Sequence, residues 1–231
     1  MSVRIHDLLE IDAERFLQGQ SSAPGWVAES LREAPFVVVR RGPTEQGIPV
    51  GIRGARRNER WAGVCQPEMI RRVLTPQTLL RLVTPLSQMD PAGKAACATR
   101  LTPVSQSLSA PRIDAILALR TLPLLAERWR EFDAPWGPGG SVGFELATGR
   151  HVTTPESDLD VVIYADTPLT ASAAQTLRDS AQGLPATVDI RVETPTCGFS
   201  LTEYASRSPA PILIRLASGP VLATDPWATP Q

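Results

Sequence analysis

The segment 157–164, with the sequence SDLDVVIY, places two carboxylates at the start of an apolar, β-branched run. The unbroken apolar run at 161–163 predicts a strand that is covered on both faces by other parts of the fold. Side chains two residues apart along a strand point to the same face, roughly 6.5 Å from each other. We therefore expect Asp158 and Asp160 to lie side by side where a buried strand begins.

The remaining pattern predicts an α+β protein with two domains. Residues 1–84 are expected to form a small N-terminal domain of short helices and strands, with helices at 26–33 and 67–83, the second broken near Pro76, and strands at 35–41, 48–52 and 61–65. Residues 85–110 are rich in Pro, Ser, Ala and Thr and are expected to be a linker containing one short helix at 94–98.

Residues 111–231 are expected to form the second domain. Its predicted helices lie at 112–130, 141–147 and 170–181, with a helical turn at 201–205, and its predicted strands lie at 158–164, 187–193 and 212–216. Pro123 is expected to kink the first of these helices. The buried stripe of that helix is expected to include Ile113, Ile116, Leu117, Leu124 and Leu125.

Composition excludes several classes of function. The 231 residues carry a formal net charge of −1, which gives no general attraction to nucleic acid. Cys65, Cys97 and Cys197 are an odd, widely spaced set that forms neither a zinc motif nor a disulfide framework. The charged start of the chain lacks the apolar stretch of a signal peptide, and no apolar run approaches the roughly 20 residues of a membrane span. We therefore expect a cytoplasmic protein that binds neither nucleic acid nor a membrane.

The paired carboxylates at the strand start point to a metal ion. Burying two like charges is costly unless a cation neutralises them. Mg²⁺ suits Asp158 and Asp160 because it binds carboxylate oxygens and is often shared with the phosphates of a substrate. The alternative is a pair of solvated or helix-capping aspartates at a strand end.

Two further features strengthen this interpretation. Gly140 and Ser141 stand at the start of a predicted helix, where backbone N–H groups and the helix dipole favour a phosphate; the alternative is an ordinary glycine turn. Asp189 lies on the polar face of the strand 187–193 with Glu193, and it would supply the third carboxylate of a two-metal site. Its alternative role is an outward-facing strand charge. Together these features favour metal-assisted transfer of a nucleotidyl-type group.

The order of these motifs resembles the nucleotidyltransferase superfamily, whose hallmark is Gly-Ser, then Asp-x-Asp, then a carboxylate on a later strand. The resemblance implies a mixed sheet flanked by helices in the second domain. One departure is that 16 residues separate Ser141 from Asp158, more than in most members. The inserted segment 145–156 includes Arg150 and His151.

Longer motifs narrow the resemblance to the phosphoribosyl-dephospho-CoA transferases of malonate decarboxylase. These motifs are GS at 140–141, LATG at 146–149, SDLD at 157–160, VDIRVETP at 188–195, FSLTEYA at 199–205, GPVL at 219–222 and DPW at 225–227. The resemblance covers most of 112–227 well and 1–84 loosely. It implies transfer of 2′-(5″-phosphoribosyl)-3′-dephospho-CoA from its 5″-triphosphate to a serine of the apo acyl-carrier subunit of malonate decarboxylase, with release of diphosphate.

The same resemblance implies roles for residues in the motifs. Asp158 and Asp160 would hold Mg²⁺ at the triphosphate, and Asp189 would hold a second metal or act as base at the serine hydroxyl. Gly140 and Ser141 would bind phosphates.

Other assignments remain open at this level. Arg150 or Arg215 would add positive charge at the phosphates, whereas His6 and His151 are expected to be structural or surface residues. One alternative function is a nucleotidyltransferase that acts on another protein or on a small molecule. Another is a non-catalytic module that binds a carrier protein.

Overall fold

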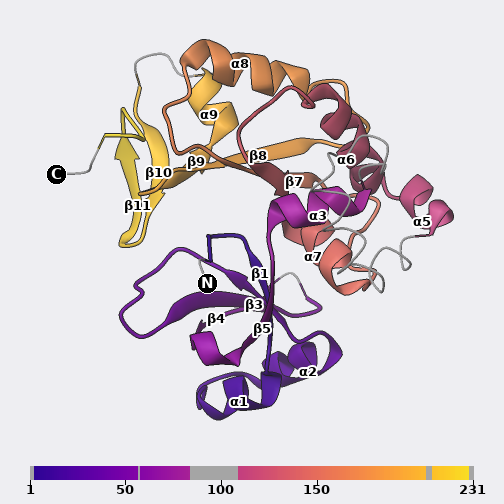
Figure 1. The fold of residues 1–231 in the computed structure, drawn as a ribbon, viewed down its shortest axis with the longest axis vertical. Helices are drawn as coiled ribbons and strands as arrows, with labels where there is room; N and C mark the ends of the chain where they lie inside the picture. The colour runs from indigo at the N-terminus through magenta and orange to yellow at the C-terminus, as the bar shows by residue number, and fades with distance from the viewer. Residues whose placement is uncertain (1–2, 57, 84–108, 207–209, 229–231) are drawn as a thin grey trace. The chain divides into compact units, whose positions relative to one another are not determined.

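Two β-sheets, one in each half of the chain, organise the residues that the structure describes (Figure 1). This computed structural model describes residues 3–56, 58–83, 109–206 and 210–228. The chain divides into two compact units, Met1–Thr75 and Pro76–Gln231. Both units combine helices with strands, which confirms the α+β class predicted from the sequence.

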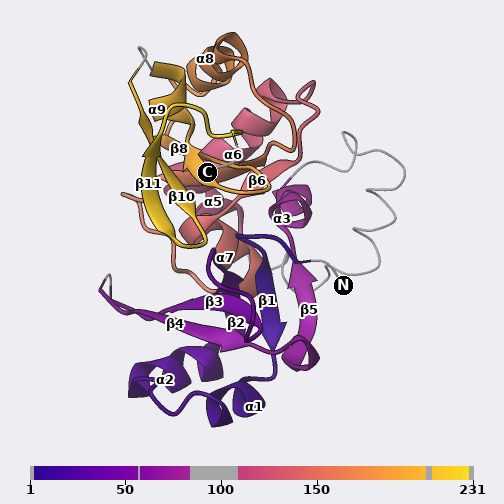
Figure 2. The same cartoon turned by 90° about the vertical axis from the view of Figure 1, so that its left-hand side faces the viewer.

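The first unit is built on a five-stranded antiparallel sheet with the strand order β4-β3-β2-β1-β5. Its strands are β1 (Leu8–Ile11), β2 (Phe36–Val39), β3 (Ile48–Arg53), β4 (Arg60–Cys65) and β5 (Ile70–Leu74). Helices α1 (Ala13–Gln18) and α2 (Gly25–Glu33) cover one face of this sheet (Figures 1 and 2). Phe16, Val27 and Leu31 of these helices are buried in one core with strand residues such as Leu9 and Val50.

Strand β5 occupies the first part of the helix predicted at 67–83, so that part of the prediction is wrong. The apolar residues of this segment have helical spacing, but the segment instead pairs with β1, and Leu74 lies opposite Leu8. Across the same two strands, the Arg72 guanidinium donates to the Glu10 carboxylate at 2.8 Å. Strand pairing with β1 therefore outweighs the local preference of residues 70–74 for a helix.

The second part of that predicted helix is confirmed. Helix α3 (Pro76–Val83) begins at Pro76. In the first part of the predicted helix, the helical structure is limited to the short 3-10 turn η1 (Pro67–Met69), directly before β5. Proline at the first helical position costs no hydrogen bond, because that N–H has no partner within the helix. Helix α3 belongs to the second unit, whereas the sequence grouped residues up to 84 with the first domain.

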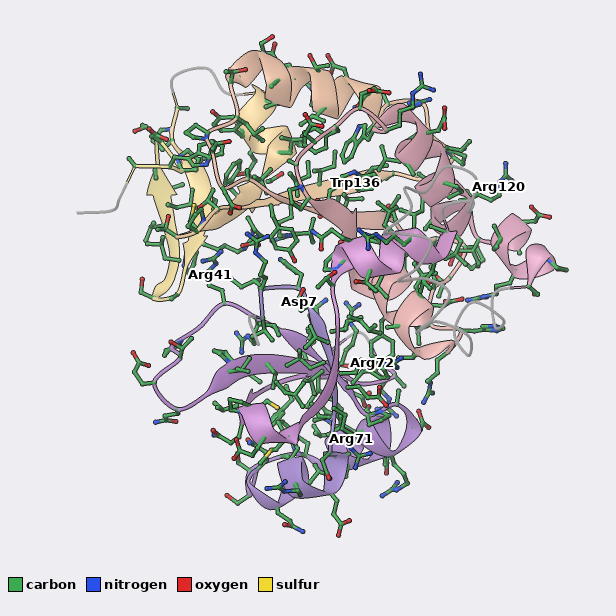
Figure 3. All side chains as sticks on the ribbon, in the orientation of Figure 1. Asp7, Arg41, Arg71, Arg72, Arg120 and Trp136 are labelled. Atoms are coloured by element: carbon green, nitrogen blue, oxygen red, sulfur yellow. The ribbon has the colours of Figure 1, made fainter. Side chains whose placement is uncertain are left out.

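Asp7, directly before β1, is a buried carboxyl group (Figure 3). Its Oδ2 accepts a hydrogen bond from the Arg4 amide at 2.8 Å, and its Oδ1 is buried without a hydrogen-bond partner among the described residues. Burial raises the pKa of Asp7 to about 6, although the Arg4 amide and nearby positive charges lower it in part. The folded protein therefore holds this carboxyl group protonated to a higher pH than the unfolded chain does.

We expect Asp7→Asn to stabilise the protein above pH 6. A carboxyl group with a raised folded-state pKa favours folding fully below its unfolded pKa of 3.8, and this stabilisation is lost as the pH rises through about 6. Asparagine does not ionise, so the variant should gain about 1–3 kcal/mol in the free energy of unfolding at pH 8 and much less at pH 4. Urea unfolding of both proteins at the two pH values measures this difference, and equal gains at both would contradict it.

The second unit is built on a six-stranded mixed sheet with the strand order β11-β10-β9-β8-β7-β6. Its strands are β6 (Trp136–Pro138), β7 (Leu159–Tyr164), β8 (Val188–Glu193), β9 (Gly198–Ser200), β10 (Ile212–Leu216) and β11 (Gly219–Ala223). Strands β7 and β8 run parallel, and the other neighbouring pairs are antiparallel.

Helices lie on both faces of this second sheet (Figure 1). Helices α6 (Leu117–Arg128), α8 (Ala171–Ser180) and α9 (Leu201–Ser206) lie on one face, and α3 and α7 (Gly140–Thr148) lie on the other. The apolar residues of β7 are buried, as the unbroken run at 161–163 predicted. Thr170 caps α8 as predicted, because its hydroxyl accepts from the Ala173 amide at 3.1 Å.

The single helix predicted at 112–130 is wrong. The chain breaks at Ile116, whose φ of −110° and ψ of 109° are not helical, and this separates α5 (Ala110–Ala115) from α6, which continues through Pro123. Leu117 and Leu124, predicted to be buried, are 39% and 48% exposed. Because the break resets the helical phase, the buried face of α6 consists of Ala118, Leu119, Thr121, Leu122 and Leu125.

Some predictions fall outside the described residues. They include nearly all of the linker predicted at 85–110, its helix at 94–98 and Cys97. Cys65 and Cys197 are buried and free of disulfide bonds. In the described ranges, every helix is too short or too polar to cross a lipid bilayer.

Candidate functional site

The parallel pairing of β7 with β8 places Asp160 directly opposite Asp189. Paired positions on neighbouring strands point to the same face and lie about 4.8 Å apart. The register therefore makes neighbours of two carboxylates that lie far apart in the sequence. Asp158, predicted to begin this strand, instead directly precedes β7 and is exposed.

The predicted Gly-Ser motif lies against Asp160. The Gly139 amide donates to the Asp160 carbonyl at 2.9 Å. Gly140 begins α7 with φ of +54°, a left-handed conformation that glycine adopts at little cost. A Cβ atom at position 140 would overlap the Asp160 carboxylate, so the start of α7 and this carboxylate are in direct contact. Ser141 follows in the first turn of the helix.

The start of α7 has the character of an anion site. Its N-cap residue is Gly139, which has no side chain to cap the helix. The first N–H groups of a helix and its dipole favour a phosphate or a carboxylate. In this unit, a helix end that favours anions therefore adjoins a pair of carboxylates that favours cations.

Arg191 adds a positive charge that the sequence analysis did not single out. It lies two residues after Asp189 on the same face of β8, and its Nη2 atom is 3.9 Å from the Asp189 Oδ2 atom. The Asp189 side chain is 49% exposed and that of Arg191 is 30% exposed. An ion pair this long and this accessible to water is weak, so an approaching anion can compete for the guanidinium. The alternation of polar and apolar residues in β8 places Arg191 on the same face as Asp189, and this pattern could have identified it from the sequence.

The paired aspartates alone do not make a closed metal-binding cage in the described part of the chain. Within the described ranges, no three His, Cys, Asp or Glu side chains gather closely enough to hold a metal ion. Mg²⁺ does not require such a cage, because it commonly binds one or two carboxylates and takes its other ligands from water and substrate phosphates. Asp160 and Asp189, which face each other in the register, fit an ion that arrives with a phosphorylated substrate.

Other candidates from the sequence lie away from the paired aspartates. Arg150 follows the C-terminal end of α7, so its backbone is about 13 Å, one helix length, from the glycine start. Arg215 is in β10, three strands from β7. Glu193 is buried at the far end of β8. His151 is exposed in the loop after α7, and His6 belongs to the first unit.

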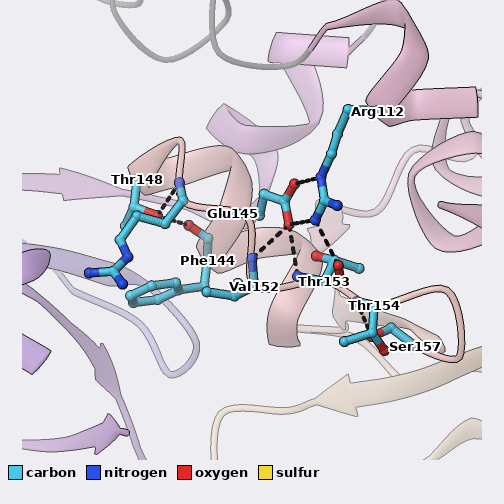
Figure 4. Close-up of polar contacts among 9 residues, drawn as sticks. Arg112, Phe144, Glu145, Thr148, Val152, Thr153, Thr154 and Ser157 are labelled. Atoms are coloured by element: carbon cyan, nitrogen blue, oxygen red, sulfur yellow. Dashed lines mark hydrogen bonds and ion pairs between the residues drawn. The ribbon is translucent and has the colours of Figure 1, made fainter. Parts of the chain in front are cut away.

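A buried ion pair connects α7 to the loop that leads into β7 (Figure 4). The Arg112 Nε and Nη2 atoms donate to the two carboxylate oxygens of Glu145 at 2.8 and 2.9 Å. The same carboxylate accepts the amides of Val152 and Thr153 at 3.1 and 2.8 Å, and Arg112 donates to the Thr153 carbonyl at 2.7 Å. Glu145 begins the segment 145–156 that was interpreted as an insertion, and the one sign of its role in the sequence is that it is a single charge within an otherwise apolar helix.

Hydrogen bonding keeps Glu145 ionised despite its burial. Burial alone raises the pKa of this carboxyl group, but hydrogen bonds from Arg112 and Thr153 outweigh burial and hold the pKa below its ordinary value. The same pairing raises the pKa of Arg112. The pair therefore remains charged on both sides at neutral pH.

Comparison with known proteins gives matches along nearly the whole chain. Residues 101–226 match the family described as phosphoribosyl-dephospho-CoA transferase MdcG C-terminal domain, and residues 4–76 match the corresponding N-terminal domain. A Pseudomonas aeruginosa protein named phosphoribosyl-dephospho-CoA transferase is 34% identical over 225 residues, which cover 96% of this chain and 92% of that protein.

Two further relatives carry the same name. The Azotobacter vinelandii protein is 33% identical over 96% of this chain and 93% of its own length. The Klebsiella pneumoniae protein is 34% identical over 97% of this chain and 96% of its own length. No solved structure matches the chain.

Proposed function

The chain belongs to the phosphoribosyl-dephospho-CoA transferase family, and we propose that it transfers the 2′-(5″-phosphoribosyl)-3′-dephospho-CoA group from its 5″-triphosphate to a serine of the apo acyl-carrier subunit of malonate decarboxylase. The chain is accordingly a transferase with a CoA-derived substrate. The observation that carries the proposal is the pairing of Asp160 with Asp189 beside the glycine start of α7.

The start of α7 would bind the phosphates of the donor. Backbone N–H groups at Gly140 and Ser141 favour an anion, and Arg191 on β8 adds positive charge to the same face of the sheet. Asp158 and Asp160 would hold Mg²⁺, which leaves the neighbouring Asp189 carboxylate available to the acceptor. When bound, Mg²⁺ neutralises charge on the triphosphate and on the diphosphate that leaves.

Asp189 is the group that we assign to the incoming serine. Its side chain is half-exposed, so a protein acceptor can approach it. The serine Oγ forms a bond to the α-phosphorus of the donor, and the bond from that phosphorus to the departing diphosphate breaks. The hydroxyl proton passes to the Asp189 carboxylate, which acts as general base. The products are a serine phosphodiester and diphosphate.

Mass spectrometry of the acceptor tests this function. The purified chain is incubated with the apo acyl-carrier subunit, the triphosphoribosyl donor and Mg²⁺. The acceptor should gain the mass of the prosthetic group, and an acceptor whose target serine is replaced by alanine should not. Chelation of the metal should stop the reaction.

Each failure in that experiment has a defined meaning. Absence of a mass gain with folded proteins would overturn the proposal. Transfer to a different protein or to a small molecule would show that the acceptor is wrong, and binding of the carrier subunit without transfer would favour a non-catalytic module.

A further inference from the structure

We propose that the buried Glu145–Arg112 pair is a positioning device that fixes the loop before β7, so that the aspartates of the site face the phosphate-binding start of α7. This inference rests on the proposed function and names residues outside its reacting groups. It concerns helix α5, helix α7 and the loop 150–158, all of which lie in the second unit.

The pair holds the loop by its backbone. Both backbone polar groups of Thr153 form hydrogen bonds to the pair: its N–H donates to Glu145 at 2.8 Å, and its carbonyl accepts from Arg112 at 2.7 Å. The Val152 amide also donates to Glu145, at 3.1 Å. The Thr153 hydroxyl is buried without a hydrogen-bond partner among the described residues. At Thr153 the backbone of this loop is therefore held by a carboxylate from α7 and a guanidinium from α5.

Glu145 and Thr153 lie in the chain segment between Gly140, at the start of α7, and Asp158. Glu145 is five residues after Gly140, and Thr153 is five residues before Asp158. Between Thr153 and Asp158, a tight turn is closed by the Thr154 amide on the Ser157 hydroxyl and by the Ser157 amide on the Thr154 carbonyl, each at 3.0 Å. One carboxylate thus links the helix that begins with the anion site to the loop that delivers the aspartates.

Stability alone does not require this ion pair. Replacing a buried ion pair with apolar residues of similar volume is often neutral or stabilising, because desolvation of two charges offsets their attraction. An apolar pair cannot, however, accept two amides and donate to a carbonyl in fixed directions. Glu145 and Arg112 therefore add hydrogen bonds of fixed direction to the loop backbone. A site whose residues come from both a loop and a helix depends on such contacts to keep those residues in place.

The test separates position from stability. Glu145→Gln and Arg112→Lys should lower kcat by about 10- to 100-fold in the fraction that is folded, since a displacement of about 1 Å can cost 100-fold. The KM for the acyl-carrier acceptor should stay unchanged. The double variant Arg112→Met with Glu145→Leu should recover thermal stability relative to the single variants while transfer stays slow.

Hydrogen exchange provides a readout that does not depend on transfer. In Glu145→Gln, amides at 152–160 should exchange faster than in the parent chain, while amides in α8 should not change. The matched control is Glu10→Gln in the first unit, which removes the charge of a partly buried ion pair with Arg72 and should leave kcat unchanged.

Two results would overturn the inference: a folded Glu145→Gln protein with unchanged kcat and exchange, or a double variant that regains transfer along with stability. If the parent chain transfers no group at all, the proposed function fails instead, and the exchange experiment still decides whether the pair fixes the loop.

Discussion

Asp160→Asn should lower the rate of group transfer by about 1000-fold while the protein stays folded. The substitution keeps the size of the side chain but removes the charge that faces Asp189 and adjoins the start of α7. A carboxylate that holds a metal ion at a transferring phosphate contributes several kcal/mol to the transition state. Its interaction with the helix start contributes only about 0.3–1 kcal/mol to folding. Initial rates at saturating donor, with thermal unfolding as a check, measure both effects.

The matched control is Asp133→Asn, which removes an exposed carboxylate elsewhere in the same unit. This variant should transfer at the parental rate. Retention of full activity and of metal dependence in Asp160→Asn would show that the site is wrongly assigned. A similar loss in both variants would point instead to a general effect of charge on the acceptor.

Gly140→Ala should lower transfer by about 100-fold, because the added methyl group has to displace the Asp160 carboxylate or the start of α7. The positive φ of +54° adds a second cost, since the left-handed conformation disfavours residues with a Cβ atom by about 1–2 kcal/mol. Activity per folded molecule, corrected by the folded fraction from circular dichroism, measures the first effect separately from the second.

Gly183→Ala isolates the cost of the backbone conformation. Gly183 has φ of +69°, and no described atom lies within 4 Å of the position that a Cβ would take. This control should lose about 1–2 kcal/mol of stability and retain its transfer rate. If both alanine variants lose activity equally, contact between residue 140 and Asp160 does not explain the effect.

The sequence predicted elements well wherever the signal was local. The apolar run of β7, the capped helix α8 and the helix that begins at Pro76 each follow from residues within a few positions of one another. The prediction of secondary structure was wrong at two segments, and at the first of them pairing with a distant strand is the cause. Residues 70–74 have helical spacing but pair with β1, and the helix predicted at 112–130 breaks at Ile116.

The candidate site likewise combines features that local sequence determines with contacts between distant segments. The sequence by itself determined which residues carry charge and their order along the chain: Gly140 and Ser141, then Asp158 and Asp160, then Asp189. Alternation along one strand is a property of neighbouring residues, so the sequence predicted a shared face for Asp158 and Asp160. In the structure β7 begins at Leu159, so of these two aspartates only Asp160 lies in the strand.

Only the tertiary structure decided which of these groups meet. The parallel register of β7 and β8 makes Asp160 and Asp189 neighbours, and the contact of Gly140 with the Asp160 carboxylate follows from the turn between β6 and α7. The burial of Glu145 against Arg112 likewise joins residues 33 positions apart. Such contacts depend on how separate segments pack, and local sequence patterns do not encode which segments will become neighbours.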